Sequence, residues 1–219
     1  AIDTSTDWIG LALFDGTRVL CEQTWRSQHY HTTELVPAIA ELFARTRTRP
    51  ADLSGLGIAL GPGSFTGLRI GMSVCKGIAL ARKLPVAGVP SLDILAAGQP
   101  ILRRPMIALL QVGRGRFAWA RYTAANNHWS REGEVQVSDA REIAATISSP
   151  VYICGEMGEE ERRILGRKWK TARLASPAQS LRRPAVLAEL AWQRLLEGKA
   201  DDAAALSPIY VHTLSNVPE

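Results

Sequence analysis

The chain has 219 residues, 46% of them hydrophobic, and a formal net charge of +5. This length suits one compact body or two lobes of about 100 residues each, and we expect two lobes. Its longest apolar runs are too short to cross a bilayer, which excludes a membrane protein. A modest positive charge is compatible with a polyanionic partner but does not indicate an activity. We expect the basic clusters, Arg182 with Arg183 among them, to lie on the solvated surface.

The three cysteines, Cys21, Cys75 and Cys154, are far apart and form no C-x-x-C pair. This excludes a disulfide framework and a cysteine-based metal site, and a reducing cytoplasm is the expected compartment. The chain begins at Ala1 within what reads as a strand. We therefore expect that an initiator methionine and a few apolar residues have been removed, and we expect no export.

The first hundred residues show three strands followed by a helix, a strand and a helix. Asp15-Gly16 is a hairpin turn signal within the strand region, and apolar residues recur at helical spacing after it. The expected segments are three strands within 1–26, a helix over 32–47, a strand over 56–60, a helix over 66–83, a strand over 84–89 and a helix from residue 91.

The same order of elements returns after residue 100, although the sequence itself does not visibly repeat. The final predicted helix has Pro184 at its start and Gly198 at its end. The expected segments are strands over 105–112, 116–123 and 128–137, a helix from 138, a strand over 150–155, a helix over 159–165, a helix over 184–198 and an extended piece over 206–211.

Two successive βββαβα lobes resemble the α/β fold of actin-like ATPases, Hsp70 and sugar kinases, which is a ribonuclease H-like fold with ATP in the cleft between the lobes. We expect an N-terminal lobe over 1–100 with the helices that would bind a partner. We expect a C-terminal lobe over 101–219, with the last helix and tail able to pack back on the first lobe. Fold alone does not give function, so the site residues have to be considered individually.

The loop "GPGSFTGLRIG" at 61–71 is typical of a phosphate-binding turn. Its glycines permit tight turns, and Ser64 or Thr66 can cap the following helix and leave amide hydrogens free for an anion. The standard signatures fail, however. Thr66 replaces the third glycine of G-x-G-x-x-G, no Walker lysine follows, and Pro62 and Thr66 exclude a G-x-S-x-G nucleophile elbow.

Asp3, in "DTST", stands where actin-like enzymes keep a carboxylate that faces metal or phosphate. A kinase of this fold needs acidic groups on both sides of its cleft, and Gln111 stands where relatives have an aspartate. We therefore favour a carboxylate that accepts turn hydrogen bonds. The residues expected to form vestigial phosphate loops are Asp3, Thr4, Ser5, Gly61, Gly63, Ser64 and Thr66.

The helix predicted over 66–83 is apolar nearly all round and carries a stripe of small residues at every fourth position, from Gly67 to Ala79. Such a helix is either deeply buried or shared with another chain, and the sequence leaves both alternatives open.

Five stretches carry a resemblance to the bacterial TsaB (YeaZ) family, in order along the whole chain. They are "AIDTST" at 1–6, "HTTELVPAI" at 31–39, "GPGSFTGLRIG" at 61–71, "KGIALARKLPVAGVPSLDIL" at 76–95 and "PIYV" at 208–211. The resemblance implies the two-lobed fold and a role in forming threonylcarbamoyladenosine in tRNA. It implies that the related transferase TsaD carries out the transfer, with TsaB and the ATPase TsaE as required partners.

The resemblance also implies that the chain pairs with TsaD through its two N-terminal helices and reaches tRNA through the complex. The same surface would allow a homodimer when TsaD is absent. The residues expected at this interface are Leu35, Ile39, Leu42, Phe43, Gly67, Leu68, Gly71, Met72, Cys75 and Ala79.

We expect no catalytic residues, no metal ligands and no cofactor of the chain's own, and the sequence leaves open a nucleotide at the partner junction. The positions that match the H-x-x-x-H metal motif of TsaD are Ser91 and Leu95, and neither can replace an imidazole. The four histidines, His29, His31, His128 and His212, form no such pair. The leading interpretation is a pseudo-enzyme subunit. The alternatives are an active phosphotransferase or ATPase that uses Asp3, and a peptidase.

Overall fold

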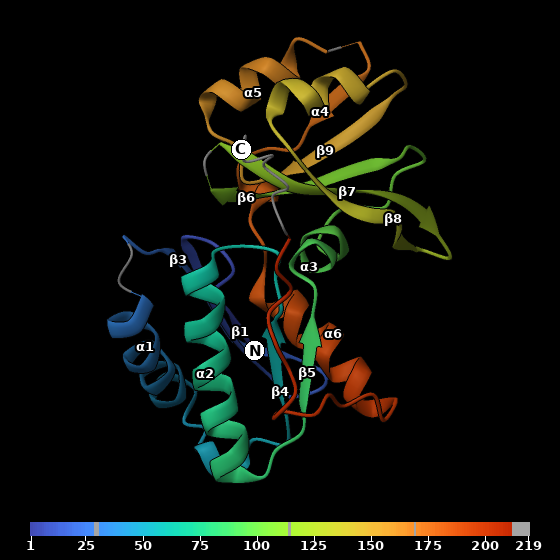
Figure 1. Cartoon of the computed structure of the whole chain (residues 1–219). Helices are drawn as coiled ribbons and strands as arrows, with labels where there is room; N and C mark the ends of the chain where they lie inside the picture. The colour runs from blue at the N-terminus through green and yellow to red at the C-terminus, as the bar shows by residue number, and fades with distance from the viewer. Residues whose placement is uncertain (29–30, 114, 169, 212–219) are drawn as a thin grey trace.

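A computed structural model describes residues 1–28, 31–113, 115–168 and 170–211. The chain forms two lobes, each with a five-stranded sheet covered by helices (Figure 1). The sheets have the orders β3-β2-β1-β4-β5 and β10-β9-β6-β7-β8, which match when one is read backwards. The strands are β1 Ile2–Asp3, β2 Trp8–Phe14, β3 Val19–Arg26, β4 Leu56–Ala59, β5 Val86–Val89, β6 Met106–Gly113, β7 Arg116–Ala125, β8 His128–Ser138, β9 Val151–Gly155 and β10 Ala172–Leu174.

The predicted order of elements and the actin-like fold are confirmed, with one additional strand, β10, in the second lobe. Two short 3-10 helices, η1 and η2, complete the list of helices. The helices are α1 His31–Thr46, η1 Pro50–Asp52, α2 Phe65–Arg82, α3 Ser91–Ala97, α4 Ala140–Thr146, α5 Glu159–Gly166, η2 Ala178–Ser180 and α6 Pro184–Leu196.

The first sheet is enclosed between α1 and α2 on one face and α6 on the other (Figure 1). Ile2 of β1 pairs with Leu11 of β2 in antiparallel register and with Ile58 of β4 in parallel register. Because side chains alternate between the faces of a strand, these three residues point into the core beneath α1 and α2. This register places Asp3 and the turn after it at the end of the sheet that faces the second lobe (Figure 1).

Two helices cross between the lobes. α3 precedes residue 100, yet Leu92 and Leu95 pack into the core of the second sheet, opposite the face covered by α4 and α5. In return, α6 comes from the end of the chain and packs on the first sheet through Leu187 and Ala191. The tail follows α6 along the same lobe, where the Ile209 amide donates to the Leu60 carbonyl at 2.7 Å. No helix in the described ranges has both the length and the apolar character needed to cross a bilayer.

The small-residue stripe of α2 lies inside the first lobe, which corrects the expectation that it meets a partner. A Cβ atom at Gly71 would overlap the Thr4 hydroxyl, and one at Gly67 would overlap the Thr4 carbonyl. The close approach that the stripe permits is therefore to the chain's own β1 turn. The expected interface residues that are buried in this way are Leu35, Leu42, Gly67, Leu68, Gly71, Met72, Cys75 and Ala79.

The other two expected interface residues, Ile39 and Phe43, are half-buried and pack against the same core. The two helices expose charged residues such as Glu41, Arg45 and Arg69, and beside them a set of other residues, most of them small. They are Val36, Ala40 and Ala44 on α1, and Ser73, Gly77, Leu80 and Ala81 on α2. We call this set the outer helix face.

We expect a glycine-to-alanine substitution to have opposite effects on stability on the two sides of α2. Gly77→Ala adds a methyl group where nothing lies within 4 Å, and it replaces a poor helix former, so we expect a gain of about 1 kcal/mol. Gly71→Ala forces Thr4 aside, and we expect a loss of about 1–3 kcal/mol. Urea unfolding of both variants measures the difference. Equal stabilisation by both changes would contradict the burial of the stripe.

Candidate functional site

A cleft of about 810 Å³ separates the lobes at the end of the first sheet where Asp3 lies. Its first-lobe wall consists of the turn after β1 and the start of α2, from Ser64 to Thr66. Its second-lobe wall consists of the end of β6, with Gln111, and the segment from Gly155 to Gly158 after β9. This is the position of the nucleotide cleft in the fold, so its polar groups show what the site can bind.

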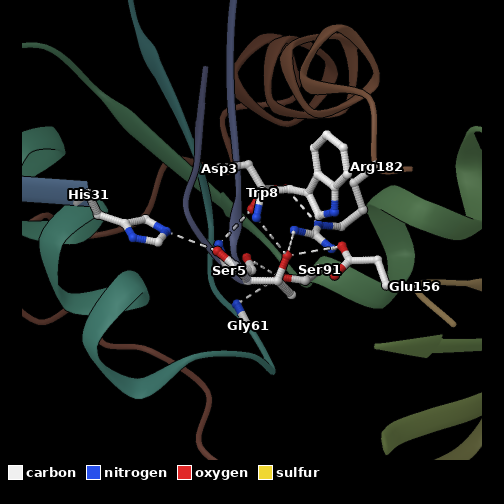
Figure 2. A network of polar contacts seen from close by, with 9 residues as sticks. Asp3, Ser5, Trp8, His31, Gly61, Ser91, Glu156 and Arg182 are labelled. Atoms are coloured by element: carbon white, nitrogen blue, oxygen red, sulfur yellow. Dashed lines mark hydrogen bonds and ion pairs between the residues drawn. The ribbon is translucent and has the colours of Figure 1, made fainter. Parts of the chain in front are cut away.

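Asp3 is buried next to this cleft, and both oxygens of its carboxylate accept hydrogen bonds (Figure 2). Oδ1 accepts a hydrogen bond from the Ser5 amide at 2.9 Å, which is the turn contact expected from the sequence. Oδ2 accepts from Nε of Arg182 at 2.7 Å, and the Arg182 side chain is only 2% exposed. Arg182 was expected on the solvated surface. It is instead the counter-ion of the candidate site.

Glu156, which follows β9, provides the acidic group of the second lobe that the sequence seemed to lack. Its Oε1 accepts from Nη1 of Arg182 and, at 3.0 Å, from the Thr6 hydroxyl. Nη2 of Arg182 donates to the same hydroxyl at 3.0 Å. From the sequence this side of the cleft was expected to lack an acidic group, because Gln111 of β6 stands where relatives have an aspartate, and the structure places Glu156 there from the end of β9. The signal available in the sequence was an acidic residue directly after the predicted strand over 150–155.

The charges in this cluster stabilise one another. Burial by itself would lower the pKa of Arg182, but the charges of Asp3 and Glu156 and their hydrogen bonds outweigh burial and raise that pKa above the usual arginine value. The guanidinium therefore stays protonated at neutral pH. Two carboxylates and one guanidinium leave a net charge of −1 at the base of the cleft.

The turn after β1 and the glycine loop before α2, which were expected to form a phosphate site, are hydrogen-bonded to each other instead. The Ser64 amide donates to the Ser5 carbonyl at 2.6 Å, and the Thr4 hydroxyl donates to the Gly67 carbonyl at 2.7 Å. A Cβ atom at Gly63 would overlap the Ser5 carbonyl, so this glycine is needed for contact between the loops. The space between them is filled by protein.

These residues do not fit a magnesium nucleotide. Both oxygens of Asp3 are occupied, and the buried guanidinium beside them would repel a divalent cation. Ser64 uses its hydroxyl to cap α2, where it accepts from the Gly67 amide at 3.2 Å. Thr66, two residues further on, is exposed at the rim of the cleft.

The remaining predicted positions have structural contacts. Ser91 and Ser5 share a hydrogen bond of 2.6 Å, and the Gly61 amide donates to Ser91 at 3.0 Å, while Leu95 is buried in the second core. His31 is the first residue of α1, and its Nε2 donates to the Thr6 carbonyl at 3.0 Å. Within the described part of the chain, no cluster of three histidine, cysteine or acidic side chains could hold a metal. His29 and His212 lie outside the described residues.

Removal of Asp3 tests how strongly the lobes depend on this cluster. We expect Asp3→Ala to lower the free energy of unfolding by about 3–5 kcal/mol, because it leaves a buried guanidinium without one of its partners. The control is Asp7→Ala, which removes an exposed ion pair with Arg26 and should cost about 1 kcal/mol or less. Denaturant titration of both variants gives the two values. If the two variants lost similar amounts of unfolding free energy, the buried ion pair of Asp3 would contribute no more to stability than an exposed one.

Comparison with known proteins agrees with this architecture. Residues 20–153 match the family model described as TsaD, tRNA N6-adenosine threonylcarbamoyltransferase. The tRNA threonylcarbamoyladenosine biosynthesis protein TsaB of Bacillus subtilis is 28% identical, with 96% of this chain and 92% of that protein covered. The Escherichia coli protein of the same name is 31% identical over 58% of this chain and 55% of its own length.

Solved structures show the same fold. YeaZ from Pseudomonas aeruginosa superposes with a TM-score of 0.77 and 22% identity, covering 96% of this chain and 97% of that one. The ethanolamine utilization protein EutJ from Carboxydothermus hydrogenoformans gives a TM-score of 0.50 and 16% identity, with 86% and 88% covered. The family resemblance seen in the sequence is confirmed: the chain has the domain of the TsaD family model and belongs to the TsaB (YeaZ) family.

Proposed function

We propose that this chain is a non-catalytic subunit in the biosynthesis of tRNA threonylcarbamoyladenosine in the cytoplasm. In this proposal it binds the transferase TsaD, holds it in an active conformation and contributes to the platform for TsaE and tRNA. The family membership supports the pathway, since the curated relatives carry that pathway in their names. The roles of the partners come from the family resemblance.

One observation supports the non-catalytic part of the proposal. Asp3, the carboxylate that a kinase of this fold would turn toward metal and phosphate, is buried in an ion pair with Arg182. Phosphoryl transfer depends on charge stabilisation of the transferred group by a metal ion or cations in the cleft. Because the buried Arg182 guanidinium is bound to two carboxylates, it is not available to a substrate phosphate.

The outer helix face is the surface that we propose for TsaD. Its small side chains on α2, such as Ser73 and Gly77, allow another helix to approach closely, and Val36 and Leu80 are 55% and 71% exposed. The match to the TsaD family model spans residues 20–153 and so includes both α1 and α2. A partner of the same fold would present a similar pair of helices. A homodimer through this face is the corresponding proposal for the isolated chain.

The alternative functions have weaker support. An active phosphotransferase would need Asp3 to release Arg182 and the two loops to separate, which breaks several buried hydrogen bonds. A peptidase is suggested by a solved relative described as similar to peptidase YeaZ. Here, however, the Ser64 hydroxyl caps α2 and His31 Nε2 is bonded to a carbonyl, so neither is arranged for nucleophilic attack.

The proposal predicts how activity is distributed in a reconstituted system. We expect the purified chain to show no ATP hydrolysis above background and no tRNA modification. Modification should appear when TsaD, TsaE and the threonylcarbamoyl donor are added, and it should fall to background when the chain is omitted. Incorporation of labelled threonine into tRNA measures this. Turnover of ATP by the isolated chain that disappears in Asp3→Ala would show that the chain is an enzyme.

A substitution on the outer helix face tests the docking surface. We expect Gly77→Leu to keep the monomer folded, because space is open around this position. It should weaken TsaD binding roughly tenfold or more, since overpacking an interface by a bulky side chain costs about 1–3 kcal/mol. The matched control is Ala145→Leu on the exposed side of α4 in the second lobe. Calorimetric titration with TsaD gives the affinities, and unchanged binding by Gly77→Leu would place the interface elsewhere.

A further inference from the structure

The Arg182 cluster joins the lobes at the point where the chain crosses between them. Asp3 belongs to the first lobe and Glu156 to the second, and Arg182 bonds to both (Figure 2). Thr6 of the first lobe also donates directly to Glu156 across the cleft. The cluster is therefore a buried polar contact between the ends of the two sheets, and two of its members, Thr6 and Glu156, also line the cleft.

The backbone on either side of Arg182 is fixed to different lobes. Before it, Arg162 of α5 donates to the Ala175 carbonyl at 3.0 Å and to the Ser180 hydroxyl at 3.3 Å, which ties this segment to the second lobe. After it, the Ala185 amide donates at 3.1 Å to Glu22 of β3, which ties the start of α6 to the first lobe. Arg182 thus lies on the crossing itself, where a change in the angle between the lobes would move it.

We propose that Arg182 is an internal clasp that holds the lobes closed without any ligand. The guanidinium donates in three directions, from Nε to Asp3, from Nη1 to Glu156 and from Nη2 to Thr6. Without it, two carboxylates from opposite lobes would face each other in a buried space and repel. The arginine therefore replaces this repulsion by an attraction to both carboxylates. This inference does not depend on the identity of any partner.

The clasp makes lobe closure a fixed property of the protein. An actin-like cleft that depends on a dissociable ligand opens when the ligand leaves, because the ligand binds the closed state more tightly. A cation that is covalently part of the chain cannot leave. The lobes should thus keep one relative orientation over the whole range of nucleotide and magnesium concentrations, and these solutes should not regulate the shape of the protein.

The experiment measures the distance between spin labels on the two lobes by pulsed electron paramagnetic resonance spectroscopy. Spin labels are placed at Ala44→Cys on α1 and Glu160→Cys on α5, both exposed, in a Cys21→Ser background. Cys75 and Cys154 are buried, and burial raises the pKa of both thiols, that of Cys75 to about 11, so they should remain unlabelled. With native Arg182 we expect one narrow distance distribution that does not change when magnesium and ATP are added.

In Arg182→Ala we expect the distribution to broaden and shift to longer distances. Guanidinium ion at about 50 mM, far below the molar concentrations that unfold proteins, should narrow it again. Urea at the same concentration is the matched control, since it has a similar planar shape but no charge, and it should have no effect. A native-like distribution in Arg182→Ala, or equal narrowing by urea and guanidinium, would overturn the clasp.

A second variant covers the case in which Arg182→Ala does not fold. Asp3→Asn, Glu156→Gln and Arg182→Met together remove all three charges and keep similar side-chain volumes, a replacement that buried ion clusters often tolerate. We expect this variant to fold and to show a broadened distance distribution. If it folds with the narrow native distribution, closure comes from packing alone and the proposed role of Arg182 is wrong.

Discussion

The ion pairs of the buried Arg182 guanidinium are the interaction on which the junction of the two lobes depends. An arginine taken out of water costs several kcal/mol unless each of its donor directions meets an acceptor, and here Asp3, Glu156 and Thr6 provide them. None of the three is close to Arg182 in sequence. The charge is therefore stable only when both sheets are formed and the lobes are together. Formation of the cluster therefore requires that both lobes are folded.

The glycine loop has an explanation that needs no ligand. Glycines before a helix are commonly interpreted as space for a phosphate, because they let the backbone approach an anion. In this chain Gly63, Gly67 and Gly71 let the loop and α2 approach the Thr4–Ser5 turn instead, and a methyl group at any of them would overlap that turn. The same residue types thus support close packing of protein against protein. A loop pattern alone cannot distinguish the two uses, since the backbone requirement is identical.

Much of the architecture could be predicted from the sequence, because the alternation of strands and helices is strongly periodic in both halves. Strand β10 was missed because it is three residues long and lies in a basic stretch without strand character. The small-residue stripe of α2 was expected at a partner interface, and it is buried against the chain's own β1 turn instead. On a helix that is apolar nearly all round, small residues at Gly71 and at Gly77 look equivalent until the position of Thr4 is known.

The charged site was harder to predict for a physical reason. An arginine in an "RRP" stretch before a helix is usually solvated, and only the chain path that brings residue 182 next to residue 3 makes it a buried counter-ion. Asp3 could be identified as an unusual carboxylate, but its role depended on which charge would meet it. A metal ion, a guanidinium and the amide hydrogens of a turn all satisfy a carboxylate, and the sequence does not rank them.

Helices α3 and α6 each pack on the lobe formed mainly by the other half of the chain. This arrangement explains how the cleft can be closed while the outer helix face stays exposed. Each lobe has one face covered by a helix that belongs, by chain order, to the other half, so the lobes are interlocked on the side away from α1 and α2. The clasp then fixes the cleft between them. What remains unconstrained is the outer helix face, whose exposed residues make no contribution to this interlocking. Because these outward residues take no part in the core or in the Arg182 cluster, they can change without disturbing the fold.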